Sequence, residues 1–180
     1  MAVHIALLRG INVGGKHSLP MARLVAFFRD AGCDEVRTYI QSGNVVFEAT
    51  AAVAARVPEA VQRSIRKRLG FDAPLVIRSG RAWAALAREH PFAGAADDPK
   101  HLHVGFLAGR PTRQAVTALD PDRSPPDTFV VRGTEIYLHY PGGSARSRLT
   151  AAYFDAALQT VTTFRNWRTV RKLAELAGVA

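Results

Sequence analysis

An alternating stretch that ends in a tight turn constrains this chain more than any other feature. Residues 35–41 alternate between apolar and polar side chains, which is the period of a half-buried strand. Ser42-Gly43-Asn44 is typical turn chemistry, and residues 45–48 are apolar again. The pattern predicts a β-hairpin over residues 35–48. Because hairpin strands pair antiparallel, this part of the chain does not fit the all-parallel sheet of a nucleotide hydrolase.

The elements around this hairpin form an order that occurs twice. In the first half, hydrophobic periodicity, caps and turn signals predict a strand, a helix, the hairpin, a second helix and a last strand, over residues 3–9, 20–31, 35–48, 58–69 and 73–78. In the second half they predict a strand, a helix, a hairpin, a helix and a weak or missing last strand, over residues 101–107, 111–119, 127–139, 149–158 and 160–163.

The repeated order predicts an α+β fold of two ferredoxin-like (β-α-β-β-α-β) halves, with antiparallel sheets and helices packed on one face. Residues 1–80 are the first half, residues 81–100 are a short helix and linker, and residues 101–180 are the second half. An extra C-terminal helix is predicted over residues 165–178. The halves share an architecture and not a sequence, so we interpret them as an internal duplication of structure.

A glycine-rich loop follows the first predicted strand. Gly10, Gly14 and Gly15 lead to Lys16, and glycines let backbone N–H groups approach an anion closely. The spacing of Gly10, Gly15 and Lys16 matches the phosphate loop of nucleotide hydrolases, but His17 stands where that loop needs a hydroxyl to hold magnesium. Two interpretations remain, a plain turn with glycines at positive φ and a looser anion-binding loop.

A second glycine-bearing loop, residues 141–148, precedes the predicted helix 149–158. It combines Gly142 and Gly143 with Arg146 and Arg148. Guanidinium groups and free backbone amides both suit phosphate, whereas a plain connection would need neither arginine. An anion site and a plain loop are equally compatible with this segment.

The predicted C-terminal helix divides into an apolar and a basic face. Trp167 lies on the apolar face, and we expect it to be structural. Arg165 and Arg168 fall in or next to the first turn, where cations oppose the helix dipole. Thr163 is a suitable cap. A bound anion would relieve the unfavourable charge placement, and solvent would also make it tolerable.

These features together predict one anion-binding concavity. Its candidate residues come from the two glycine loops, the hairpin turn and the C-terminal helix: Arg9, Asn12, Gly14, Gly15, Lys16, Ser42, Asn44, Arg146, Arg148, Arg165, Asn166 and Arg168. No nucleophile–base pair or carboxylate pair stands out, so we assign no catalytic residue. His101 and His103 stand at i, i+2 without a third ligand, which favours an exposed strand face over a metal site. No cofactor is predicted.

Charge and cysteine content indicate which partners and which cellular compartment to expect for the protein. The net charge is +9, from 24 basic and 15 acidic residues, and a basic excess attracts polyanions. Arginine and alanine dominate this composition, as in proteins of GC-rich genomes, so charge alone is weak evidence for nucleic acid. Cys33 is the single cysteine, which excludes an intrachain disulfide and fits a reducing cytosol. With no signal peptide and no apolar run of about 20 residues, we expect a cytoplasmic protein without a membrane partner.

Several motifs together resemble one family. They occur at residues 7–15, 39–45, 91–92, 140–143 and 165–169. In combination they are similar to the domain of unknown function 1697 family of small bacterial proteins, over residues 1 to about 177. The resemblance implies an α+β fold with ferredoxin-like halves, and it implies no substrate, cofactor or catalytic residue. Ala145 departs from the pattern, because the family favours a larger residue at this position.

Three classes of function fit these observations. The first is an anion- or phosphate-binding module whose partner is nucleic acid or a nucleotide-like ligand, although the aromatic signature that stacks bases on such sheets is absent. The second is an enzyme that acts on a small phosphorylated or anionic metabolite. The third is a scaffold or homodimer without chemistry.

Overall fold

The computed structural model describes residues 1–180, and the chain forms two compact units. The first unit comprises residues 1–85 and 173–180, and the second comprises residues 86–172. Each unit is α+β and contains a four-stranded sheet whose neighbouring strands all pair antiparallel. None of the helices combines the length and apolar character that a bilayer span requires.

The sheet of the first unit has the strand order β2-β3-β1-β4. Its strands are β1 (Ala2–Leu8), β2 (Asp34–Tyr39), β3 (Asn44–Ala49) and β4 (Leu75–Ser79). The predicted hairpin is present as β2 and β3, with Tyr39 opposite Asn44. β1 lies in the middle and pairs antiparallel with both β3 and β4. The parallel arrangement of a nucleotide hydrolase is therefore excluded for this unit.

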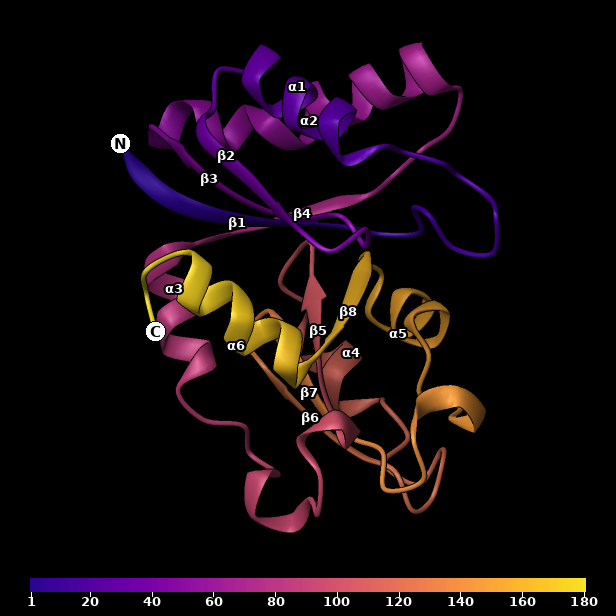
Figure 1. Ribbon diagram of the computed structural model, residues 1–180. Coiled ribbons are helices and arrows are strands. Elements are labelled where there is room, and N and C mark those ends of the chain that lie inside the picture. Colours follow the sequence, from indigo (N-terminus) through magenta and orange to yellow (C-terminus); the bar gives the residue numbers. More distant parts are fainter. The chain divides into compact units, whose positions relative to one another are not determined.

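Two helices, α1 (Met21–Asp30) and α2 (Ala51–Leu69), cover one face of this sheet (Figure 1). α2 begins seven residues before the predicted start at Pro58. Thr50 caps it by accepting a hydrogen bond from the Val53 N–H, and the helix continues through Pro58. Gly70 ends it in the left-handed conformation, as predicted.

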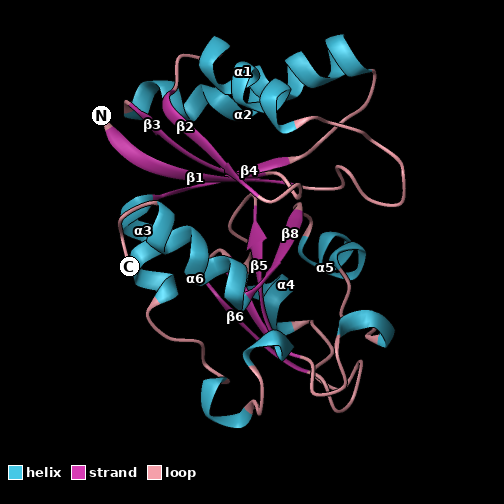
Figure 2. Ribbon diagram, viewed as in Figure 1, coloured by secondary structure: helices cyan, strands magenta, loops and turns pink.

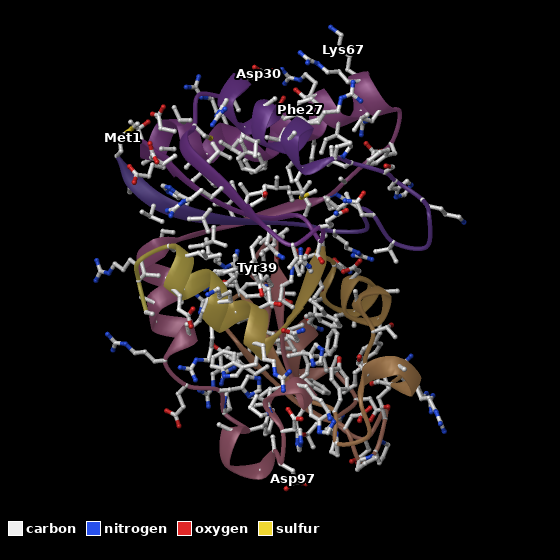
Figure 3. All side chains as sticks on the ribbon, in the orientation of Figure 1. Met1, Phe27, Asp30, Tyr39, Lys67 and Asp97 are labelled. Atoms are coloured by element: carbon white, nitrogen blue, oxygen red, sulfur yellow. The ribbon has the colours of Figure 1, made fainter.

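The core of the first unit lies between these helices and the sheet. Phe27 and Phe28 of α1 are buried, and the ring centroid of Phe28 lies 5.2 Å from that of Phe47 on β3. Figure 3 shows Asp30 and Lys67 on the outer surface of these helices, whereas Phe27 is buried beside Arg68 of α2. Apolar residues at helical spacing thus decide which faces of α1 and α2 are buried.

The second unit has the strand order β6-β7-β5-β8. Figure 2 distinguishes its strands, in magenta, from its helices, in cyan. Its strands are β5 (Leu102–Leu107), β6 (Thr128–Arg132), β7 (Glu135–His139) and β8 (Thr162–Asn166). The short helix α4 (Arg113–Thr117) and α5 (Ala151–Leu158) pack on one core cluster with β5 and β7. α3 (Gly80–Ala87) and α6 (Trp167–Leu176) are the remaining helices, and 3₁₀ turns occur at Ala93–Ala95, Pro99–His101 and Ser144–Arg146.

The prediction of a weak or missing last strand in the second half is wrong. β8 has five residues and pairs with the central strand β5, with Thr163 opposite Phe106. Gly105 makes this pairing possible, because a Cβ there would lie 2.5 Å from the Phe164 ring. Contacts of this kind come from tertiary packing and leave no signal in the local sequence around residues 160–163.

The start of the C-terminal helix also differs from the prediction. α6 begins at Trp167 and not at residue 165, because Asn166 caps it by accepting a hydrogen bond of 2.8 Å from the Thr169 N–H. Thr163 lies inside β8 and is not the cap. Arg165 therefore belongs to a strand, and the argument from the helix dipole applies to Arg168 alone.

Trp167 is buried, and its ring meets the edge of the His90 ring at 5.1 Å between centroids. We expect Trp167→Ala to lower the free energy of unfolding by ~3–5 kcal/mol, because it removes a large aromatic side chain and leaves a cavity. Urea denaturation followed by circular dichroism measures this change. An unchanged urea midpoint would mean that the indole ring contributes little and is accessible for another role.

Gly43 in the β2–β3 turn has a φ of +77°, and a Cβ there would lie 2.7 Å from the Cβ of Leu8. Gly14 has a similar φ of +59° but open space around it. We expect Gly14→Ala to cost about 1–2 kcal/mol for the left-handed backbone, and Gly43→Ala to cost roughly 1–3 kcal/mol more for the clash. Equal urea midpoints for the two variants would show that the turn can move away from Leu8.

Candidate functional site

The first glycine loop is the tip of a small hairpin. Val13 and Lys16 form an isolated antiparallel bridge, and the Lys16 N–H donates to the Val13 carbonyl at 3.1 Å. Gly14 and Gly15 between them have φ of +59° and +71°, the left-handed values that a two-residue hairpin turn requires. α1 begins only at Met21, so the end of this helix does not lie next to Lys16 in the chain.

Asn12 and Asn44 of the predicted site hold the backbone of the first unit together. The Asn12 amide donates to the carbonyls of Leu19 and Gln41 and accepts from the Leu19 N–H, at 2.8–3.0 Å. It thereby joins the glycine loop to the β2–β3 turn. Asn44 is fully buried and donates to the Tyr39 carbonyl at 3.1 Å. Both amides therefore satisfy buried or turn carbonyls within the fold.

Three further predicted residues lie near one end of the first sheet, each in a different segment: Arg9, Ser42 and Lys16. Arg9 is half-buried directly after β1, and its N–H donates to the Pro74 carbonyl at 2.9 Å. Ser42 is exposed in the turn that Asn12 holds, and Lys16 is exposed at the hairpin tip. Hydrogen bonds thus bring the turn and the base of the glycine loop together, while Lys16 lies at the far end of that loop.

The second glycine loop contains two of the predicted arginines, and a neighbouring loop adds a third. Arg146 ends a 3₁₀ turn, and Arg148 follows two residues later. The Arg148 N–H donates to Ser124 Oγ at 3.0 Å, and the Arg148 carbonyl accepts from Arg123 Nε at 3.1 Å. Ser124 Oγ in turn donates to Asp127 at 2.9 Å. These bonds join residues 120–127 to residues 141–148, and we name Arg123, Arg146 and Arg148 the arginine cluster.

Arg123 is the most firmly positioned member of the arginine cluster. Its guanidinium carbon lies 4.0 Å from the ring centroid of Tyr153, a cation–π contact. The Tyr153 hydroxyl is itself fixed, since it accepts from the Asp120 N–H at 3.1 Å. With Nε bound to a carbonyl and one face on a ring, the Arg123 side chain loses little further freedom when its remaining N–H groups bind a ligand.

The arginines of the cluster form no ion pair, in contrast to other arginines of the chain, although Asp120, Asp122 and Asp127 lie in the same loop as Arg123. Arg123, Arg146 and Arg148 make no ion pair with a carboxylate. On α2, Arg66 pairs with Asp72 at 2.6 Å and Arg63 pairs with Glu59. The first turn of α5, which directly follows the cluster, contains no acidic residue either. Thr150 caps α5 through the Tyr153 N–H, so the positive end of the helix dipole adds to the arginine charges.

The other predicted residues of the second unit are committed to different contacts. Arg165 on β8 is half-buried, it donates to the Phe164 carbonyl at 2.8 Å, and burial lowers the pKa of its guanidinium to about 10. Arg168 pairs with Asp98 at 3.1 Å, and Asn166 is the cap of α6. Residues 165–168 and the arginine cluster both lie at the sheet end where β7 and β8 finish and β6 begins.

The two glycine loops do not occupy corresponding places in their units. The first follows β1, which is the first strand of its sheet, and the second follows β7, which is the third strand of its sheet. Because first and third strands run antiparallel in each sheet, their C-terminal ends lie at opposite ends of it. The two loops therefore lie at non-equivalent ends of their respective sheets.

His101 and His103 are half-buried and do not share one exposed strand face. His101 belongs to a 3₁₀ turn before β5, so it does not share a strand with His103. His103 Nδ1 is buried, and its ring meets the Tyr140 ring edge-on at 5.1 Å. The half-buried position of His103 corrects the prediction of an exposed strand face. No three His, Cys, Asp or Glu side chains gather into a metal-binding cluster.

Arg123 was missed by the sequence analysis. It lies in residues 120–126, where aspartate, proline and serine predict only a turn. In the sequence, the only indication of a functional role for Arg123 is a single arginine within that turn. Arginines are too frequent in this chain for one of them to indicate a site. Its position over Tyr153, 30 residues away in sequence, depends on how α5 packs.

The comparisons with known proteins agree with this architecture. The family model described as protein of unknown function (DUF1697) matches residues 1–137. The chain belongs to the DUF1697 family. Its fold is similar to that of the conserved bacterial protein SP0830 from Streptococcus pneumoniae, with a TM-score of 0.66, 23% identity and 98% of each chain covered. Among curated protein sequences, none matches the chain. The family resemblance drawn from the motifs is confirmed, and at this identity the similar structure supports the fold alone.

His90, just before the family motif Pro91-Phe92, has a fixed neutral form. It is buried, its Nε2 lies 3.0 Å from the His103 carbonyl, and its Nδ1 accepts from the Phe92 N–H at 3.3 Å. Nε2 therefore carries the hydrogen. Burial lowers the pKa of His90, the hydrogen bond to the His103 carbonyl opposes part of this shift, and the nearby His139 and Arg132 lower the pKa further. Burial also lowers the pKa of His103.

These pKa shifts predict a loss of stability in mild acid. The folded pKa of His90 lies below its unfolded value near 6.5, so the unfolded state binds the proton first. Stability is full above about pH 6.5 and falls as the pH decreases toward the folded pKa, by at most about 1.4 kcal/mol per pH unit for this group. Urea denaturation between about pH 7.5 and pH 5 measures the slope. His90→Gln should reduce the slope, with His103 supplying what remains, and an unchanged slope would contradict the assignment.

Proposed function

We propose that the protein is an anion-binding module whose ligand presents a phosphate group to the arginine cluster. One observation carries the proposal: Arg123 is held by Tyr153 and by the Arg148 carbonyl, and no carboxylate neutralises it. A guanidinium that is positioned, partly desolvated and unpaired suits a bidentate contact with phosphate. Arg146 and Arg148 lie on the adjoining loop, and the N-terminus of α5 follows them.

We infer that the two units are ferredoxin-like. Each has the order β-α-β-β-α-β, and the strand orders β2-β3-β1-β4 and β6-β7-β5-β8 correspond to each other position by position. The first helix of the second unit, α4, is reduced to five residues. The same fold order occurs in RNA-recognition domains, which is why nucleic acid stays within the proposal.

The aromatic residues favour recognition of phosphate over recognition of bases. The exposed large hydrophobic residues are Met1, Val13 and Ile40, and none of them is aromatic. Arg123 covers the ring of Tyr153. Single-stranded nucleic acids are held largely by stacking on accessible rings, whereas a phosphate needs only donors and positive charge. We therefore place a phosphorylated small molecule or a nucleic-acid backbone, and not a stacked base, at the arginine cluster.

Binding of pyrophosphate and of a fluorescein-labelled dodecathymidylate tests the proposal. We expect Arg123→Ala and Arg148→Ala each to weaken binding by ~1–3 kcal/mol, because each removes a charge-assisted contact. Each should also flatten the dependence of log affinity on log salt for the oligonucleotide by about one contact. Calorimetry with pyrophosphate and fluorescence anisotropy over a salt series are the measurements. Binding of pyrophosphate alone would identify a small phosphorylated ligand.

The matched control is Arg66→Ala, which removes an exposed arginine that already has a carboxylate partner in Asp72. We expect this change to leave both affinities nearly unaltered. If Arg66→Ala weakens binding as much as Arg123→Ala, diffuse charge holds the anion and the specific site should be abandoned. Lys16→Ala examines the first glycine loop in the same way, and we expect a smaller effect than at Arg148, because Lys16 stands alone on a hairpin tip.

A further inference from the structure

We propose that β6, an edge strand of the second sheet, binds an extended acidic segment of a partner protein, which adds a further strand to that sheet. β6 stands at the end of the strand order β6-β7-β5-β8 and pairs with β7 alone. An edge strand presents backbone N–H and C=O groups that can pair with another chain. The proposal uses none of the residues of the arginine cluster, so it goes beyond the proposed function and does not depend on it.

The register of the second sheet shows which backbone groups of β6 are open. The Leu107 N–H donates to the Thr134 carbonyl at 2.9 Å, so every second residue of β7, counted from Thr134, bonds to β5. The residues between them bond to β6, where Val130 is one of their partners. The N–H and C=O groups of Phe129 and Val131 therefore point away from β7, and no other part of the chain bonds to them.

The three other edge strands are closed or deformed. On β4 and β8 an arginine side chain donates to the carbonyl of the residue before it, Arg78 to Ile77 at 2.9 Å and Arg165 to Phe164 at 2.8 Å. Both carbonyls lie on the side of their strand that has no neighbouring strand. The register of β2 is irregular beside Glu35, whose φ is +47°. Bulges and charged side chains keep edge strands from pairing, and the regular, apolar centre of β6 has neither.

The charge beside β6 favours a carboxylate on the partner. Arg132, the last residue of β6, is exposed and forms no ion pair. Glu135 lies opposite it on β7, but the Glu135 carboxylate accepts from the Thr134 hydroxyl at 2.9 Å. Asp127 directly precedes β6, so the other end of the strand is the less suitable place for a negative group. We therefore place the carboxylate of the partner opposite Arg132, since cross-strand pairs of opposite charge stabilise a sheet.

Charge and size favour a partner segment over a second copy of the chain. Each copy has a net charge of +9, so two copies repel each other, whereas an acidic segment is attracted. β6 has five residues, and pairing two such strands buries far less than the ~1,200 Å² of a stable interface between folded proteins. A flexible segment needs only the strand edge and can reach it without bringing two positively charged bodies together.

The two faces of β6 set the side-chain pattern of the segment. Phe129 and Val131 pack on the core cluster of the second unit, so the side chains opposite them should be apolar. Arg132 projects from the other face, and the side chain opposite it should be acidic. The antiparallel peptide acetyl-Gly-Glu-Val-Thr-Val-Thr-Gly-amide meets this pattern, with its glutamate opposite Arg132 and its valines opposite Val131 and Phe129.

Two-dimensional ¹⁵N–¹H NMR of the whole chain with this peptide tests the proposal. We expect the peptide at millimolar concentration to shift the amide signals of Phe129 and Val131 and to slow their hydrogen exchange, because both N–H groups become bonded. N-methylation of both valines removes the donors that face β6 and should weaken binding at least about tenfold. N-methylation of both threonines alters groups that point away from β6 and is the matched control. Equal binding of the two methylated peptides, or no shift at β6, would overturn the proposal.

Variants and a second peptide test the charge of the partner. The peptide with glutamine in place of glutamate should bind about twofold to fivefold more weakly, and Arg132→Gln should remove this preference. Arg37→Gln is the control, because Arg37 is an exposed arginine on the irregular edge strand β2. A preference for glutamate that survives Arg132→Gln would show that the acidic partner is wrong. Dimers in sedimentation, with Phe129 and Val131 protected from exchange before peptide is added, would assign the edge to a second copy and overturn the proposal.

Discussion

The structure of each unit depends on one strand that is hydrogen-bonded along both of its edges. β1 pairs antiparallel with β3 and β4, and β5 pairs antiparallel with β7 and β8. The central position satisfies the backbone groups of these buried strands, which would otherwise be costly. It also fixes which loops meet at each end of the sheet. The candidate site follows from this constraint, since the arginine cluster lies at the end of the second sheet where β7 and β8 finish and β6 begins.

The candidate site arises where positively charged side chains have no ion-pair partner after the loops have formed their hydrogen bonds. Asn12 and Asn44 use their amides on backbone carbonyls, and Arg168 is neutralised by Asp98. Arg123 is different, since its hydrogen bond and its ring contact position the side chain without neutralising it. Whether a polar side chain is structural or available to a ligand therefore depends on its hydrogen-bond and ion-pair partners in the fold. The residue type alone does not show which of the two it is.

Much of the fold could be predicted because local sequence patterns determine it. Alternation over residues 35–41 and the turn at Gly43 gave the first hairpin, and helical spacing gave the buried faces of α1 and α2. Local patterns failed at α2, which continues through Pro58, and at β8, which depends on the space beside Gly105. The candidate site was less predictable, because glycines beside a lysine fit a hairpin tip as well as an anion loop.

The sequence by itself determined the α+β class, the repeated order of elements and the family, since these depend on periodicity, turn chemistry and motif combinations. Tertiary structure alone decided which polar groups remain available. Arg123 and Tyr153 stand 30 residues apart, and their contact exists only once α5 packs on the sheet. Arg66 and Arg123 are both single arginines in a basic chain, yet Arg66 forms an ion pair with Asp72 and Arg123 forms none. Pairing between charges is set by distance in space, and distance along the sequence does not report it.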